Sequence, residues 1–119
     1  MTLFLIGIGG AVGAAARYRL GAVLLRKEKH TFPFGTLFIN LIGSLLLGFF
    51  SGMHLSESAF GLLGDGFCGG FTTFSTFTLE GVQLICGKAR KKAVWYILFT
   101  VLAGLLCFLA GYRAAMLLY

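Results

Sequence analysis

The residues best suited to chemistry lie between positions 71 and 78, where phenylalanines alternate with hydroxyl side chains. Phe71, Phe74 and Phe77 recur at intervals of three, which predicts one aromatic stripe along a helix. The hydroxyls beside this stripe belong to Ser75, Thr76 and Thr78. Phenyl rings have positive edges and hydroxyls donate hydrogen bonds, so these groups could replace the hydration shell of a small anion that must also be released. The alternative is an aromatic stripe used only for packing.

A glycine-rich segment, residues 64–73, overlaps the start of this stripe. Gly69-Gly70 costs about 2 kcal/mol of helix propensity relative to two alanines, and Thr72 and Thr73 add little support, so we expect the helix to break within this segment. A break inside a membrane leaves carbonyls that must be buried in protein or bind something. Carbonyl oxygens suit a hard cation such as Na⁺, and the N-terminus of a half-helix suits an anion. A kink stabilised by packing alone is the alternative.

Further polar residues stand in otherwise apolar segments. Asn40 can donate its NH₂ group to an anion, cap a broken helix or bond to a neighbouring helix. Arg17 lies deep in the first segment, and an intramembrane arginine is by default functional; we expect it to give a vestibule a positive field. Arg19 is nearer the interface, where it can snorkel. Tyr96 and Thr100 lie one turn apart in the last segment, although Tyr96 also fits an interfacial anchor.

These residues must be held by membrane-spanning elements, because the composition excludes other classes. The 119 residues are 58% hydrophobic and only 12% charged, about half the charged share of a soluble domain. A soluble globular domain is therefore excluded, and so is a disordered chain, which needs low hydrophobicity. No nucleophile–base constellation or metal-ligand cluster indicates an enzyme. The three cysteines have no metal-like spacing and fit small apolar packing residues.

Four apolar segments divide the chain, at residues 3–25, 34–53, 59–86 and 93–118. Because about 20 helical residues cross a hydrocarbon core of about 30 Å, each segment is long enough to span it. Open strand edges are not tolerated in lipid. We therefore predict an all-α membrane protein, a single domain over residues 1–119 with four transmembrane helices. The third segment is longer than the bilayer core, which again favours a helix broken near mid-membrane. Gly9 with Gly13, and Gly48 with Gly52, predict close helix packing.

The charge pattern predicts an orientation in the membrane. Ten Lys and Arg against four Asp and Glu give a net charge of +6. In a soluble protein this excess would point to nucleic acid, but in a membrane protein it marks cytoplasmic loops. Arg17, Arg19 and the bases of loop one (residues 26–33) and loop three (residues 87–92) are expected at one membrane face, and Arg113 at the other. We therefore predict no nucleic-acid partner, loops one and three inside, and both termini outside.

The first three segments each carry a longer motif. These are Gly9-Gly10-Ala11-Val12-Gly13-Ala14-Ala15-Ala16-Arg17-Tyr18, Gly35-Thr36-Leu37-x-x-Asn40-x-x-Gly43 and Gly66-Phe67-Cys68-Gly69-Gly70-Phe71-Thr72-Thr73-Phe74-Ser75-Thr76-Phe77. Together they resemble the bacterial fluoride-specific ion channels, the Fluc or CrcB family. The resemblance implies a passive fluoride exporter in the plasma or inner membrane that protects the cell from fluoride toxicity. It also implies an antiparallel, dual-topology-type dimer with two narrow pores along the subunit interface.

The resemblance further implies roles for single residues. The implied fluoride pathway comprises Asn40, Phe74, Ser75, Thr76, Phe77, Tyr96 and Thr100. Arg17 matches the vestibule arginine of that family. The backbone carbonyls of Gly69 and Thr72 match positions that hold a structural Na⁺, which is not transported, at the dimer centre. Asp65 precedes the third motif and receives no role from the resemblance.

Two other functional classes remain as alternatives. A small proton-coupled multidrug-type transporter is similarly short, four-spanning and dimeric, but it needs a carboxylate in its first helix, and segment 3–25 contains no Asp or Glu. A non-conducting membrane assembly subunit would use Phe74 and Phe77 only for packing. The charge bias adds a question about the dimer. An antiparallel pair requires either inverted copies of this chain, as a homodimer, or a heterodimer with an oppositely oriented homologous subunit.

Overall fold

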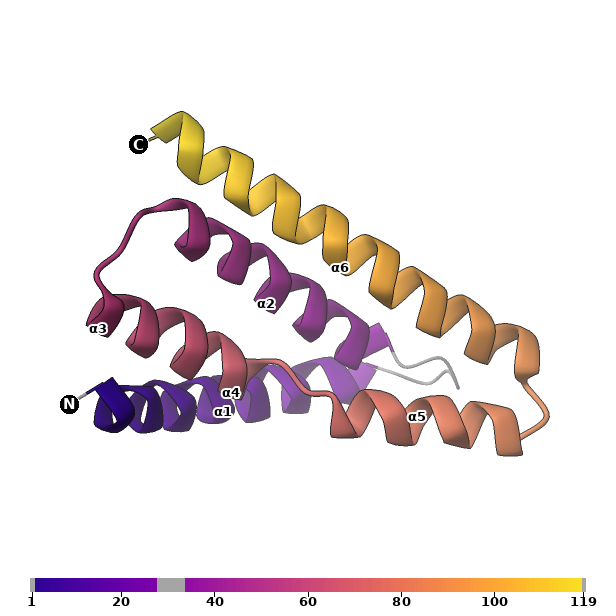
Figure 1. Cartoon of the computed structure of the whole chain (residues 1–119). Coiled ribbons are helices and arrows are strands. Elements are labelled where there is room, and N and C mark those ends of the chain that lie inside the picture. The colour runs from indigo at the N-terminus through magenta and orange to yellow at the C-terminus, as the bar shows by residue number, and fades with distance from the viewer. Residues whose placement is uncertain (1, 28–33, 119) are drawn as a thin grey trace.

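A computed structural model describes residues 2–27 and 34–118, and most of these residues are helical (Figure 1). The elements in chain order are α1 (Thr2–Lys27), α2 (Phe34–Gly52), α3 (Glu57–Phe60), the π-helix η1 (Gly61–Cys68), α4 (Gly69–Phe71), α5 (Ser75–Cys86) and α6 (Arg90–Leu118). The described residues contain no strand. Figure 1 places both chain ends at one end of the elongated molecule and the α5–α6 turn at the other. The prediction of an all-α protein is confirmed.

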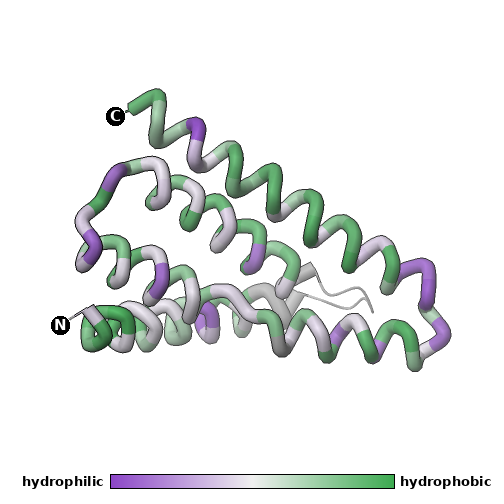
Figure 2. Tube along the Cα trace, in the orientation of Figure 1, coloured by the Kyte–Doolittle hydropathy of each residue, from purple (hydrophilic) through white to green (hydrophobic). Residues whose placement is uncertain are grey.

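Three helices are long and apolar enough to cross a membrane. The spans are Thr2–Val23 in α1, Gly35–Gly52 in α2 and Arg90–Leu118, which is α6. Figure 2 shows apolar residues along these three helices. They correspond to the predicted segments 3–25, 34–53 and 93–118. The third predicted segment, residues 59–86, is made of shorter helical pieces, so its crossing of the membrane stays a prediction.

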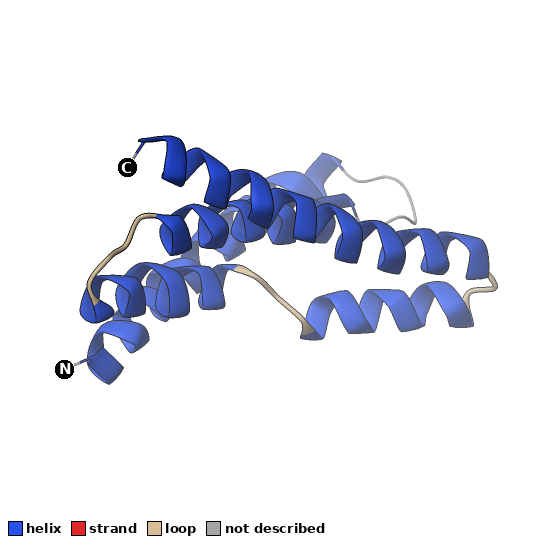
Figure 3. Cartoon of the chain, turned by 45° about the horizontal axis from the view of Figure 1, so that its top comes forward, coloured by secondary structure: helices blue, strands red, loops and turns tan. Residues whose placement is uncertain are grey.

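The predicted helix break exists and begins near the end of the predicted segment 64–73 (Figure 3). Gly69 and Gly70 both belong to α4, and the chain becomes extended only at Thr72, with φ −80° and ψ 159°. The break therefore lies at the Thr72–Thr73 end of the predicted segment and not at the glycine pair. Gly70 packs closely on α1, because a methyl group there would overlap the carbonyl of Gly10, whereas one on Gly69 would meet no described atom within 4 Å apart from the backbone of its own helix.

The π-helix η1 lies against α1 and leads directly into α4. Its buried residues are Gly61, Gly64, Gly66 and Cys68. A methyl group on Gly9 would collide with the Leu62 carbonyl, and one on Gly13 would collide with the Phe67 carbonyl. The predicted packing role of the first glycine pair is thereby confirmed. The sequence analysis did not anticipate a π-helix, a rare element that is frequent at functional sites.

Helices α2 and α6 form the other closely packed pair. A methyl group on Gly48 would overlap the Phe108 carbonyl, and one on Gly52 would lie 2.8 Å from the Ala115 side chain. The packing role predicted for this second glycine pair is also confirmed. A small core beside the break joins α2, α5 and α6. Its buried residues are Leu37, Leu84, Ala93 and Tyr96.

Several residues that were predicted to lie in loops belong to helices in the structure. Arg26 and Lys27 belong to α1, and Arg90, Lys91 and Lys92 form the first turn of α6. Lys29 lies outside the described residues. The third loop is therefore shorter than the predicted residues 87–92, and most of its bases stand on a helix rather than on a flexible connection. Cys68, Cys86 and Cys107 are free thiols.

Candidate functional site at the helix break

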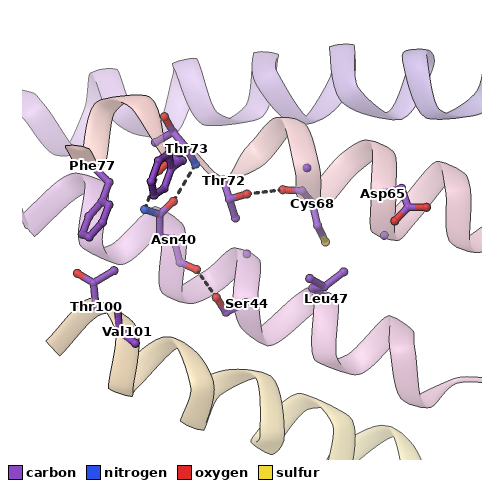
Figure 4. Close-up of a pocket in the computed structure, with 14 residues that line it drawn as sticks. Asn40, Ser44, Leu47, Asp65, Cys68, Thr72, Thr73, Phe77, Thr100 and Val101 are labelled. Atoms are coloured by element: carbon purple, nitrogen blue, oxygen red, sulfur yellow. Dashed lines mark hydrogen bonds between the residues drawn. The ribbon is translucent and has the colours of Figure 1, made fainter. Parts of the chain in front are cut away.

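The break between α4 and α5 is held by the side chain of Asn40 on α2 (Figure 4). Asn40 Nδ2 donates to the Thr73 carbonyl at 3.0 Å, and Asn40 Oδ1 accepts from the Thr73 N–H at 2.9 Å. One amide thus satisfies both backbone groups of a residue that lies outside any helix. Of the uses predicted for Asn40, the structure shows the capping of a broken helix.

Arg17 holds the neighbouring residue from the α1 side. Its Nη1 atom donates to the Thr72 carbonyl at 3.2 Å. The Thr72 hydroxyl donates to the Cys68 carbonyl, one turn earlier, at 2.9 Å. Side chains therefore partner the backbone of the break, as a membrane interior requires. The half-buried guanidinium also places its positive charge at the break itself.

A shallow groove of about 530 Å³ runs past the break. Six of the predicted site residues line it: Asn40, Gly69, Thr72, Phe74, Phe77 and Thr100. The Thr100 hydroxyl is buried and has no hydrogen-bond partner among the described residues. Asp65 also lines the groove, and it is the charged residue of the lining. The groove thus brings aromatic rings, an amide and a hydroxyl from α2, α5 and α6 to one place.

Three aromatic rings connect the surface of this groove to the core. The Phe74 and Phe77 centroids are 6.1 Å apart, and those of Phe77 and Tyr96 are 5.2 Å apart. Phe74 is 78% exposed, whereas Tyr96 is fully buried and is a core ring rather than an exposed interfacial anchor. Phe71 lies before the break and stacks on Phe67. The predicted single stripe of Phe71, Phe74 and Phe77 is therefore wrong, because the extended residues interrupt the helical spacing.

A second cavity, of about 470 Å³, lies next to the break. Its lining contains Arg17, Tyr18, Gly21, Ala22, Thr36, Ile39, Thr73 and Thr76. Thr73 also lines the groove, so the two spaces share this residue. The structure therefore divides the predicted site: Arg17 and Thr76 lie in the second cavity, and Tyr96 lies beneath Phe77. Ser75 begins α5, and its side chain lies outside the described part of the chain.

Two polar contacts near the break were missed by the sequence analysis. The Thr73 hydroxyl accepts a hydrogen bond from the Thr76 N–H at 3.2 Å, which caps the start of α5. The Thr36 hydroxyl donates to Glu80 Oε1 and thereby ties α2 to α5. A helix that breaks inside a membrane needs side chains that cap its free backbone groups, and this need could have drawn attention to Thr73. Thr36 and Glu80 are 44 positions apart, and nothing in the sequence pairs them.

This fold and site define a small helical membrane protein in which long apolar helices position a broken one. The chain belongs to the family described as CrcB-like protein, Camphor Resistance (CrcB), whose family model matches residues 4–112. The resemblance found in the sequence is thereby confirmed, as is the prediction of a multi-pass membrane protein of bacteria.

Curated relatives match the chain over almost their whole lengths. A Clostridium acetobutylicum protein named Fluoride-specific ion channel FluC 2 is 42% identical over 93% of this chain and 95% of its own. A Rhodococcus jostii protein of the same name is 43% identical over 95% and 97%. Fluoride-specific ion channel FluC 1 of Ligilactobacillus salivarius is 42% identical over 89% and 92%. These relatives are named as ion channels, not enzymes, in agreement with the prediction.

Proposed function

We propose that this chain is a subunit of a fluoride-selective channel that lets cytoplasmic fluoride leave the cell passively and so protects the cell from fluoride toxicity. The observation that carries the proposal is the capped helix break beside a groove with an exposed Phe74 ring and a buried Thr100 hydroxyl. Membership of the CrcB-like family and the names of the relatives support the same function.

Apart from Asp65, the polar and aromatic groups that line the groove suit a small, strongly hydrated anion. Phe74 and Phe77 offer positive ring edges, and Thr100 offers a buried hydroxyl. Asn40 has two amide hydrogens; one donates to the Thr73 carbonyl, so the other can donate to an ion. Several moderate donors replace the hydration shell without trapping the ion, as conduction requires.

The second cavity is the proposed entrance to this pathway. Arg17 places a positive charge there, and Thr76 lies beside it. Electrostatic attraction raises the local concentration of an anion. From this vestibule, fluoride would reach the groove at Thr73, which both spaces share. Ser75 and Tyr96 complete the pathway implied by the resemblance.

A narrow pore requires a second subunit, because the groove is open on the surface of one chain. In the proposed assembly, residues 59–86 also cross the membrane, as a broken helix that is the third of four spans in chain order. Two antiparallel subunits cover each other's grooves. The partner is an inverted copy of this chain or an oppositely oriented homologue. The charge bias favours the second arrangement, as do relatives whose names carry the numbers 1 and 2.

A structural Na⁺ at the centre of this dimer is proposed for the carbonyls of Gly69 and Thr72, and the surrounding residues fit such an ion. Gly69 is exposed in the groove. The Thr73 N–H, which would donate to the Gly69 carbonyl in a continuous helix, donates to Asn40. The Thr72 carbonyl accepts from Arg17 and retains a second lone pair. When bound, the ion would supply a fixed positive charge between hard oxygen donors.

Fluoride efflux from liposomes that contain the purified chain tests the proposal. Phe74→Ile removes a ring edge from the groove and should abolish efflux. Phe4→Ile is a matched control, because Phe4 is also strongly exposed but does not line the groove; it should conduct normally.

The same assay distinguishes the alternatives for the assembly. Efflux by this chain alone would show that an inverted copy suffices. Efflux only after co-reconstitution with an oppositely biased homologue would indicate a heterodimer. A well-folded dimer without efflux in either case would contradict the channel proposal and favour an assembly subunit.

A further inference from the structure

The turn between α5 and α6 concentrates positive charge at one end of the molecule. Lys88, Arg90, Lys91 and Lys92, here called the basic turn, fall within five positions, and residues 81–119 contain no Asp or Glu. Figure 2 shows the hydrophilic segment at this end of the α5–α6 hairpin, followed by the apolar length of α6. The cations of the basic turn therefore lie where the apolar helix would enter a bilayer.

The backbone makes this concentration of charge costly. Because α6 begins at Arg90, three bases occupy the first turn of a long helix, where the helix dipole is already positive. Lys88 adopts φ 61°, in the left-handed region that is uncommon for residues other than glycine. An anion among these groups would offset both the mutual repulsion of the bases and their opposition to the dipole.

The surface around the basic turn has an apolar side as well. A shallow groove of about 860 Å³ is lined by the four bases and by Ile85, Cys86 and Ala89. A smaller one, of about 250 Å³, is lined by Arg90, Lys91, Val94 and Trp95. Trp95 is 69% exposed, and an exposed tryptophan next to bases is typical of the level of lipid headgroups. The complementary ligand therefore has an anionic head and an apolar tail.

We propose that the basic turn binds the headgroup of an anionic phospholipid, with acyl chains lying along Val94 and Trp95. A soluble phosphate would match the bases but would leave the apolar side uncovered. The anionic leaflet of a bilayer attracts such juxtamembrane clusters. Because α5 carries Phe77 and ends at this turn, the bound lipid would anchor the hairpin that holds the aromatic rings. The proposal is independent of the transported ion.

Trp95 is the only tryptophan in the chain and serves as the reporter. The full chain is reconstituted into phosphatidylcholine vesicles that contain brominated phosphatidylglycerol or brominated phosphatidylcholine at equal mole fraction. Brominated phosphatidylglycerol should quench Trp95 more strongly, and added salt should reduce the difference. Lys88→Gln/Arg90→Gln should lower the preference by up to about fivefold per base. Arg113→Gln, which removes one charge at the predicted opposite membrane face, should preserve the preference, whereas Arg90→Gln alone should lower it.

Arg90→Lys keeps the charge and should retain the preference, which separates a loss of charge from a loss of folding. Equal quenching by the two brominated lipids would overturn the proposal. An equal loss in Arg113→Gln and Arg90→Gln would overturn it too, because net charge alone would then explain the effect. Loss of the preference in inorganic phosphate, but not in chloride of the same ionic strength, would assign the site to a soluble anion.

Discussion

Asn40 stabilises the break with two hydrogen bonds to Thr73 and has one amide hydrogen left for an ion. We predict that Asn40→Ala loses efflux and lowers the free energy of unfolding by about 2–4 kcal/mol, because both backbone groups of Thr73 lose their partner. Asn40→Asp keeps an acceptor for the Thr73 N–H but has no donor when ionised. It should therefore lose efflux while retaining more stability than Asn40→Ala.

Thermal unfolding in detergent and liposome efflux measure these two effects separately. Ser51→Ala is the control, because Ser51 likewise donates to a carbonyl one helical turn earlier, that of Leu47, and does not line the groove; it should change both quantities little. Normal efflux by Asn40→Asp would contradict a donor role for the amide.

Arg17 combines a hydrogen bond to the Thr72 carbonyl with a positive charge in the second cavity. We predict that Arg17→Gln lowers stability by about 1.5–3 kcal/mol, the usual worth of a hydrogen bond from a charged group, and also lowers efflux. Arg17→Lys keeps the positive charge, so it should restore the electrostatic contribution to efflux, which depends on ionic strength. It should not restore the free energy of unfolding, because lysine lacks the planar fork of donors. Arg19→Gln should have little effect on unfolding. Wild-type stability in Arg17→Gln would show that the bond to Thr72 does not hold the break.

At the scale of the elements, glycines set how closely the helices approach. We predict that Gly13→Ala and Gly48→Ala each destabilise the protein by about 1–3 kcal/mol, because each new methyl group meets a carbonyl of the neighbouring helix. Gly7→Ala is the matched control, since apart from the backbone of its own helix no atom of the described residues lies within 4 Å of the position its methyl group would take. It should be neutral or slightly stabilising. Equal unfolding temperatures for the three variants would contradict this account of the packing.

The same scale shows where local rules failed. The low helix propensity of residues 64–73 predicted a break in this segment, but the glycine pair stays helical and the chain leaves the helix at Thr72. Spacing predicted that Phe71 and Phe74 lie on one stripe, but three extended or irregular residues separate α4 from α5. The contacts that hold these residues, from Arg17 to Thr72 and from Asn40 to Thr73, join positions far apart in the chain, which no local pattern reports.

At the scale of the whole molecule, the distribution of the bases predicts an orientation. The prediction can be checked in cells with a variant whose native cysteines are replaced by serine and which carries one cysteine at a terminus. A membrane-impermeant maleimide should label it mainly from outside, because loops one and three are expected inside. Replacing the bases of the basic turn with glutamine should make labelling from the two sides more equal. Equal labelling from both sides of the membrane, in a protein that keeps its native bases, would show that the charge bias does not fix the orientation.

The sequence by itself determined the class of protein, the extents of the three long helices, the glycine contacts and the family. These follow from composition, segment length and motifs, which depend on neighbours close in the chain. Only the tertiary structure decided where the third segment breaks, that Asn40 caps Thr73, and that Arg17 and Thr76 face a cavity different from that of Phe74. Asn40 and Thr73 are 33 positions apart, and the packing of helices, not the local chain, brings an amide to the backbone groups that a break leaves without helical partners.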